Sequence, residues 1–355
     1  MFLSLKFSTS KVLISIISTV LFICALVALP AVSQAGVSRG LLLCYTVLIP
    51  SLFPYFFALD YLYSLLLSSD RLKSKTVLIL ISFVLSLVGG YPMGARILSC
   101  LVERGVLSKA EASVYLCAFV NAGPAYLISG VGLSLFKSET VGALLFFSLC
   151  ISSVLCFLLS MLVVTRLKPP CAEAKTITSS ASAELSVSLS NAVSSTFRLC
   201  SYVILFSCLI EIIKYALSLL SLHSEKLLWL VSTIIEVSTA AGYAAKISST
   251  QGAFLALASV SLCSASVVLQ IRAFTRSKEI SLLPFFLSRP LHLLFSLCLF
   301  KLFLSLPLGK AAFTFLSVGR LSVAAFSVSP FVSFFLFLAS FILLVGNKKI
   351  SLFTN

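Results

Sequence analysis

Charge is scarce in this sequence. Only 10% of its 355 residues are Asp, Glu, Lys or Arg, against about 25% in a typical soluble domain. Acidic residues are the rarer part, with 11 Asp and Glu beside 26 Lys and Arg. Hydrophobic residues make up 59% of the chain, and the mean hydropathy is +1.14. This composition is typical of a protein embedded in a lipid bilayer.

The formal net charge of +15 does not indicate nucleic-acid binding. The basic residues lie in short gaps between apolar runs, which is the pattern of a membrane protein with positively charged cytoplasmic loops. We therefore expect the lipid bilayer as a partner and no nucleic acid.

Histidine is almost missing, and the signatures of common enzymes are absent from the sequence. The two histidines, His223 and His292, have no Cys, His or carboxylate cluster beside them in sequence. No CxxC pair occurs among the 11 cysteines, most of which lie in apolar segments and resemble small hydrophobic residues. No HExxH motif occurs, and GVSRG (36–40), the one GxSxG spacing, follows no strand pattern and so forms no nucleophile elbow. We expect no metal, no cofactor and no enzymatic activity.

The N-terminal part of the chain predicts a membrane helix. Val12 to Pro30 carries no charge and follows Lys6 and Lys11. At about 19 residues it is long enough to cross a bilayer; a cleaved signal peptide is the alternative. We assign residues 1–39 to this helix and an external turn.

Residues 40–167 form the first of two repeats that we expect. The run from Gly40 to Ser69 is too long for one straight helix, and its prolines Pro50 and Pro54 predict a kink. Asp60 lies near the end of this run, where we expect it to be solvated.

Two stretches of the first repeat interrupt the apolar pattern. Leu85 to Arg96 reads LSLVGGYPMGAR, and Phe119 to Pro124 reads FVNAGP. Broken backbone at membrane depth is tolerated only where it is buried in protein or lines a wet cavity, so both stretches predict a binding site. Because Thr76 to Val102 is too short for two spans, we expect a re-entrant hairpin there; a fully spanning pair is the alternative. Ser108 and Glu111 form a capping-box pattern that predicts the start of the helix carrying FVNAGP.

The second half repeats this plan after a Ser- and Ala-rich cytoplasmic linker, which we assign to residues 168–198. Residues 199–308 form the second repeat, in which residues 227–247 are the second hairpin, entered from outside the cell. Residues 309–355 complete the chain with a last helix over 321–345 and a basic tail. Within the second repeat, Glu211 and Lys214 lie three residues apart, so we expect them to neutralise each other.

Together these segments predict an all-α polytopic membrane protein. It has about eight or nine transmembrane helices and two re-entrant hairpins in an inverted repeat, as in secondary transporters. We place it in the cell (inner) membrane with both termini in the cytoplasm.

We expect a small solute to bind where the two hairpins face each other. Ends of broken helices offer free N–H groups and positive dipole ends to an anion. Arg96 would add charge, and a carboxylate within a span, such as Glu236, is functional by default. The predicted substrate-binding residues are Gly89, Gly90, Tyr91, Pro92, Gly94, Arg96, Asn121, Gly123, Pro124, Glu236 and Gln270.

Each of these assignments has a plainer alternative. The glycines could serve close helix packing, and Asn121 could form an ordinary hydrogen bond between helices. Glu236 could pair with Lys246 or Arg289. A non-transporting membrane scaffold would need nothing more than these packing roles.

Three motifs carry a resemblance to a known family. They are GGYPMGAR (89–96), the helix start LSKAEAS (107–113) and NAGP (121–124). With them the chain resembles the sporulation integral membrane proteins of the YlbJ type, relatives of the nucleoside-recognition or Gate domain membrane proteins. IPSLFPYFF before these motifs, and Glu236, Gln270 and the SRP triplet (288–290) after them, fall where that family has comparable features. The resemblance covers about residues 41–300.

The resemblance implies a multi-pass protein connected with endospore formation that moves a small molecule. Dipicolinate is the implied cargo, and nucleosides are the cargo suggested by the Gate relatives. Two positions depart from the family pattern, because Val120 stands where a second Asn is frequent and Cys263-Ser264 where a Gly-Gly pair is expected. We therefore expect a transporter of a small anionic solute, with a nucleoside transporter or a membrane scaffold as alternatives and a homo-oligomer left open.

Overall fold

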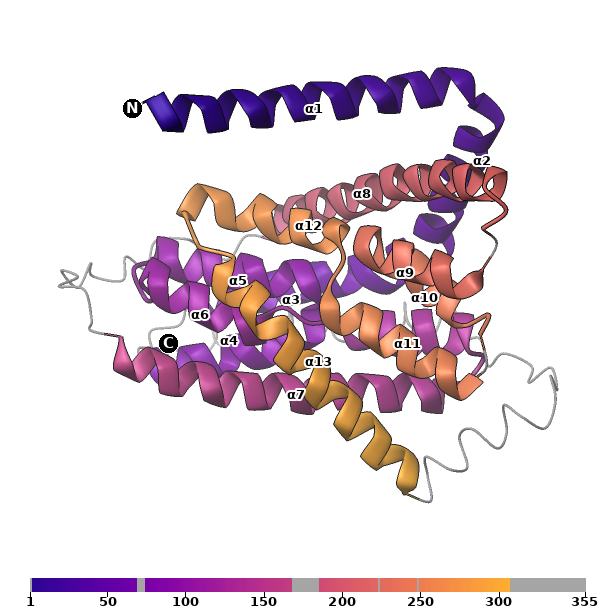
Figure 1. Cartoon of the computed structure of the whole chain (residues 1–355). Helices are drawn as coiled ribbons and strands as arrows, with labels where there is room; N and C mark the ends of the chain where they lie inside the picture. Colours follow the sequence, from indigo (N-terminus) through magenta and orange to yellow (C-terminus); the bar gives the residue numbers. More distant parts are fainter. Residues whose placement is uncertain (1, 69–73, 168–184, 223, 248, 307–355) are drawn as a thin grey trace. The chain divides into compact units, whose positions relative to one another are not determined.

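The structure is a computed structural model that describes residues 2–68, 74–167, 185–222, 224–247 and 249–306. All of them belong to the first of two compact units, Met1–Phe315, shown in Figure 1. The second unit, Leu316–Asn355, lies outside the described residues. The helix expected over 321–345 therefore lies outside them too.

The described residues form helices and connecting segments, with no strand among them. The first half contains α1 (Phe2–Ala28), α2 (Pro30–Leu43), a π-helical turn η1 (Cys44–Leu48), α3 (Ile49–Ser68), α4 (Lys75–Gly89), α5 (Tyr91–Glu103), α6 (Lys109–Phe119), the π-helix η2 (Ala125–Leu135) and α7 (Glu139–Arg166). The second half contains α8 (Leu185–Leu219), α9 (Glu225–Ile235), α10 (Val237–Ala244), α11 (Ser249–Leu262), α12 (Ala265–Thr275), the short 3₁₀ helix η3 (Arg276–Lys278) and α13 (Leu283–Ser305).

Several of these helices are long and apolar enough to cross a bilayer. Within the described residues four segments qualify, namely 139–166, 185–219, 250–278 and 283–305, and a fifth if the bent pair formed by residues 12–28 and 30–46 is one span. That pair bends by 102° at Leu29. The external turn expected before residue 39 is thus confined to this bend, because the chain is helical again from Pro30.

The same order of elements occurs twice along the chain. Each half has one long helix, a pair of short helices separated at a single residue, a second interrupted pair, and a final long helix. In the first half these are α3, α4 with α5, α6 with η2, and α7; in the second half they are α8, α9 with α10, α11 with α12, and α13. The two final helices, α7 and α13, pack against each other across the halves (Figure 1).

Local sequence explains where several elements begin and bend. The side chain of Ser108 accepts from the backbone N–H of Glu111 and the Glu111 carboxylate accepts from that of Ser108, so the predicted capping box is confirmed. In the Pro-containing run, a π-helical turn, Cys44–Leu48, precedes Pro50, and α3 continues through Pro54; the predicted kink stays a prediction. A π turn is a common way to accommodate a local mismatch in a helix.

The linker prediction was too long. Residues 185–198 are the first turns of α8 rather than linker, while residues 168–184 lie outside the described part of the chain. The small side chains of Ser188, Ala192 and Thr196 are buried, and α8 packs against α3. Ser and Ala let membrane helices approach closely, so here they form a packing face.

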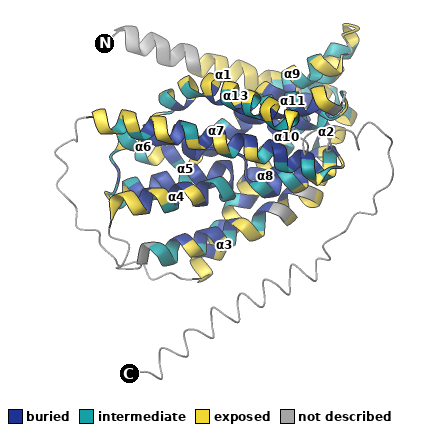
Figure 2. Cartoon of the chain, turned by 90° about the horizontal axis from the view of Figure 1, so that it is seen from below, coloured by how far each residue is buried: buried dark blue, intermediate teal, exposed yellow. Residues whose placement is uncertain are grey.

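Buried residues gather on the helix faces that meet other helices, as Figure 2 shows in dark blue. An aromatic cluster lies between α4, α6 and α7, where the rings of Phe83 and Phe157 stack with centroids 4.2 Å apart and Phe119 lies beside both. Large apolar side chains on the outer faces of α7, α8 and α13 are exposed, as expected for helices that face lipid.

Candidate functional site

The first break separates α4 from α5 at Gly90. Its backbone has φ +78° and ψ −175°, a conformation essentially restricted to glycine. A Cβ on Gly90 would lie 3.4 Å from the nitrogen of Gly123, and one on Gly123 would lie 2.7 Å from the carbonyl oxygen of Val88. The interruption between α6 and η2 thus lies directly against the break at Gly90.

The second half has a corresponding break at Glu236, between α9 and α10. Glu236 has extended backbone, and its carboxylate accepts hydrogen bonds from the N–H groups of Ser238 (2.9 Å) and Thr239 (2.6 Å). The remaining N–H at this helix start, that of Val237, donates to the hydroxyl of Ser264 at 3.1 Å. The acid therefore caps its own helix, and the break at 236 is joined to the break at 263–264.

Arg289 on α13 contacts the helix interruptions of both halves. Its guanidinium donates to the carbonyl oxygens of Cys117 (2.5 Å) and Val120 (3.4 Å), at the end of α6, and lies 3.8 Å from the sulfur of Cys263. The last carbonyls of a helix have no partner within it and favour a nearby cation. Arg289 is thus a positioning residue for both breaks rather than a partner of Glu236.

One cavity lies where these interruptions meet. It is lined from the first half by residues of η1, α3, the break at 89–92 and the segment 122–126, and from the second half by residues of α8, the break at 236–238 and α12. Its volume is about 40 Å³, enough for about three water molecules. Its polar lining includes Tyr126, Glu236, Ser238 and Gln270.

Two of these polar groups make no well-formed hydrogen bond within the described residues, although the Ser238 side chain lies near the hydroxyl of Tyr126. The hydroxyl of Tyr126 makes no well-formed hydrogen bond, and neither does the side-chain oxygen of Gln270. Both residues are more than 90% buried. Because burying a polar group without a partner is unfavourable, these two groups are suited to contact water or a solute in the cavity.

The structure brings seven of the eleven predicted site residues to this cavity. They are Gly89, Gly90, Tyr91, Pro92, Gly123, Glu236 and Gln270. Four do not line it. Gly94 packs α5 against the carbonyl of Phe119, Asn121 donates to the carbonyl of Ala118 (2.5 Å), Pro124 starts η2, and Arg96 points elsewhere.

Arg96 forms an ion pair with Asp60, with 2.7 Å between nitrogen and oxygen. The Asp60 side chain is only 8% exposed, and Asn191 donates a second bond to it at 3.1 Å. The prediction of a solvated Asp60 is therefore wrong. Arg96 has its own counter-charge outside the cavity and, in this conformation, offers no free positive charge to a solute.

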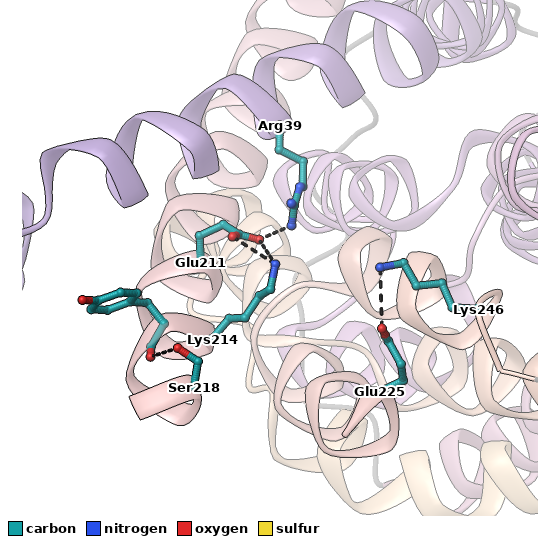
Figure 3. Close-up of polar contacts among 7 residues, drawn as sticks. Arg39, Glu211, Lys214, Ser218, Glu225 and Lys246 are labelled. Carbon is teal, nitrogen blue, oxygen red and sulfur yellow. Dashed lines mark hydrogen bonds and ion pairs between the residues drawn. The ribbon is translucent and has the colours of Figure 1, made fainter. Parts of the chain in front are cut away.

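A second hollow lies between α2, α8 and α9, where Figure 3 shows its ionic groups. Glu211 pairs with Arg39 from α2 and lies 3.4 Å from Lys214, while Lys246 lies 3.9 Å from Glu225. These charges are satisfied by one another, so the expected pairing of Glu211 with Lys214 is present but shared with Arg39. Among the described residues, no group of three His, Cys, Asp or Glu lies close enough to hold a metal.

Sequence reasoning missed four residues that matter at this site. Tyr126 lies two positions after NAGP and could have been found by extending that motif. Ser264 was named only as part of a departure from the family pattern and Val267 not at all, since no Gly or Pro of this sequence marks the break. Arg289 was considered only as an ion-pair partner, although a buried arginine in an apolar helix is itself a signal of function.

Comparisons of the chain with protein-family models, with curated proteins and with solved structures found no match.

Proposed function

We propose that this chain is a secondary transporter that binds a small solute between its two halves. One observation carries the proposal: helix interruptions from both halves line one cavity within a chain of apolar helices. Breaks of this kind are tolerated at membrane depth where they face protein or a wet cavity. Transporter sites are commonly built from such discontinuous segments.

Helix lengths support two re-entrant hairpins in this proposal. At 1.5 Å per residue, α4 is about 22 Å long and α9 about 16 Å, both shorter than a hydrocarbon core of about 30 Å. The pairs α4 with α5 and α9 with α10 would therefore enter and leave on one side. The remaining helices, with the segment after residue 308, give about eight spans, and opposite hairpin orientations would make the halves an inverted repeat.

A small anionic solute suits the break at Gly90. Helix α5 begins there without a side-chain cap, and its first turn offers the N–H groups of Tyr91 and Met93, since Pro92 has none. Such a helix start attracts anions. We propose the sporulation membrane type as the family and dipicolinate as the first solute to test, on the basis of GGYPMGAR, LSKAEAS and NAGP. At about 40 Å³ the cavity is too small for this solute in the present conformation, so the proposal includes widening of the cavity when the solute binds.

A nucleoside is the second candidate, and one observation favours it. Glu236 is the only acidic or basic residue among those that line the cavity. A neutral nucleoside would need no positive charge there, and its hydroxyl and base edges could bond to Gln270 and Tyr126.

Counterflow in proteoliposomes tests both candidates. Purified protein is reconstituted, vesicles are loaded with unlabelled dipicolinate or uridine, and entry of the labelled solute is followed. We expect counterflow of one solute by the wild type, and a half-saturation concentration raised about tenfold in Gln270→Leu, since one hydrogen bond is lost. Gly242→Ala is the control, because nothing lies within 4 Å of the added Cβ.

Two results would contradict the proposal. Wild-type vesicles that move neither solute would favour the membrane scaffold, which needs no binding cavity. Counterflow that Gln270→Leu leaves unchanged would show that solute binds elsewhere in the protein.

A further inference from the structure

Glu236 differs from the other buried acids of this protein. Its side chain belongs to a residue that is 1% exposed, yet none of the ion pairs among the described residues includes it. Asp60 has Arg96 beside it, and Glu211 has Arg39. An unpaired carboxylate inside a membrane helix is costly. The negative charge of Glu236 is held by backbone N–H groups at the start of α10 and by the side chains of Ser238 and Thr239, none of which carries a positive charge.

No cation pairs with Glu236: the buried guanidinium of Arg289 on α13 contacts the carbonyls of Cys117 and Val120 and the sulfur of Cys263 instead. The titratable groups near it are Cys44 from η1, Tyr91 from α5 and Tyr126 from η2, none of which carries positive charge. Helices α3, α8 and α12 present only uncharged side chains to the cavity, and α11 has no ionisable residue. The ionisable residues of α9 are in its first turn, away from the break.

The polar groups around Glu236 can accommodate a proton on its carboxylate. Each oxygen of Glu236 accepts one N–H of α10, so the oxygen that takes the proton can keep its N–H bond through a remaining lone pair while its new hydroxyl donates. The unpartnered oxygen of Gln270 lines the same cavity and is an acceptor. The proton would thus find a matching group in the cavity itself.

Charge balance links this proton to an anion. With the cavity empty, Glu236 contributes one negative charge. A dianion such as fully ionised dipicolinate would raise this to three, and protonation of Glu236 lowers it to two. The proton thus removes the repulsion between the bound anion and an ionised carboxylate in a low-dielectric region.

We propose that Glu236 binds the proton that accompanies each solute anion, so that the protein is a proton-coupled symporter. The inference rests on the proposed transport function. The proton reaches a carboxylate oxygen of Glu236 from the side where the anion enters and leaves to water on the side where the anion is released. No bond of the solute is changed.

Binding measured against pH tests this coupling. Dipicolinate is added to the detergent-purified protein over a pH range in which dipicolinate stays fully ionised, and affinity is read from the ligand-induced shift in melting temperature. We expect the affinity to rise by up to tenfold for each unit by which the pH is lowered, the slope for one proton taken up per anion. A pH dye inside proteoliposomes should report acidification as the anion enters.

Matched variants separate Glu236 from the other acids. Glu236→Gln should bind dipicolinate with no dependence on pH, and Glu236→Asp should keep the dependence. Glu225→Gln, which removes a half-exposed acid on α9 outside the cavity, should behave as the wild type. Acidification is measured with the wild type alone. The test of proton coupling therefore does not depend on whether each variant folds.

Failure of the coupling and failure of transport give different results. Two results overturn the proton inference while transport stands. One is wild-type counterflow with an affinity that does not depend on pH. The other is counterflow that causes no acidification and stops when choline replaces sodium. A pH dependence of affinity that persists in Glu236→Gln assigns the proton to another group and also overturns the proton inference. No dipicolinate counterflow at any pH contradicts the proposed transport of this anion, and the inference falls with it.

Discussion

The phenolic oxygen of Tyr91 donates a hydrogen bond to the carbonyl oxygen of Val260 at 2.7 Å, joining residues that are 169 positions apart. Tyr91 is the first residue of α5, and Val260 lies in the last turn of α11. The carbonyls of that turn have no partner within the helix because α11 ends at Leu262. Tyr91, which follows the break at Gly90 in the first half, therefore stabilises the end of α11, next to the break at Cys263 in the second half.

We expect Tyr91→Phe to weaken this connection between the halves. The substitution keeps the ring and removes one hydrogen bond, which should lower the free energy of unfolding in mixed micelles by about 1 kcal/mol. Tyr63→Phe is a matched control, because the hydroxyl of Tyr63 lies near Ser82 but makes no well-formed hydrogen bond among the described residues. Equal stabilities for wild type and Tyr91→Phe would contradict the assigned role.

Gly90→Ala should destabilise the protein through backbone conformation. With φ +78° and ψ −175°, any residue with a Cβ is strained, at a cost of about 1–3 kcal/mol. Gly242→Ala, within α10, should instead be neutral or stabilising by up to about 1 kcal/mol, because its Cβ has free space and alanine favours helix. Unfolding of both variants in mixed micelles measures the contrast, and a Gly90→Ala variant as stable as the wild type would argue against the break.

Asp60→Asn should be among the more damaging single polar substitutions. It leaves Arg96 largely buried without a counter-charge, and breaking a buried pair costs about 3 kcal/mol or more. Removing both charges in Asp60→Asn with Arg96→Gln should cost much less than either single change. A double-mutant cycle on unfolding free energies measures this coupling, and additive losses would show that the pair contributes nothing.

The capping box at Glu111 makes a pH-dependent contribution to stability. Burial raises the pKa of this carboxyl, but the bonds from Lys75 and Ser108 outweigh it and hold the pKa below its ordinary value. The contribution is therefore present above the unfolded pKa of about 4.3 and is lost as the pH falls through the lower folded pKa.

Glu111→Gln isolates that contribution, since glutamine can keep the capping bond to Ser108 and lacks only the charge. The wild type should be more stable by about 0.5 kcal/mol between pH 5 and pH 7, and the difference should shrink below about pH 4. Thermal unfolding in detergent over this range measures it. A difference that stays constant down to pH 3 would assign the effect to something other than the carboxylate.

Local signals in the sequence predicted the parts of the site that glycine and proline mark. GGYPMGAR located the break at Gly90, and the S-x-x-E pattern located the start of α6, because backbone conformation and capping depend on neighbouring residues. Glu236 and Gln270 were chosen as polar residues in apolar segments, and both line the cavity.

Pairings between distant residues could not be predicted in this way. Asp60 was expected in solvent because its partner Arg96 is 36 positions away and only the folded chain brings them together. The break at Cys263 has φ +62° without glycine, so the residues themselves do not mark it, and only the resemblance, which expects a Gly-Gly pair there, drew attention to it. Residues 185–198 were assigned to a linker because serine and alanine occur both in linkers and in packed membrane helices.

The accessibility of the cavity to water tests the account most directly. Val267 and Val260 are both about 2% exposed or less, but only Val267 lines the cavity. Val267→Cys and Val260→Cys are treated in membranes with a small water-soluble thiol reagent, and modification at each position is quantified by mass spectrometry. We predict modification at position 267, slowed by dipicolinate or uridine, and none at position 260. Equal lack of modification at both positions would contradict a solute-binding cavity between the two halves.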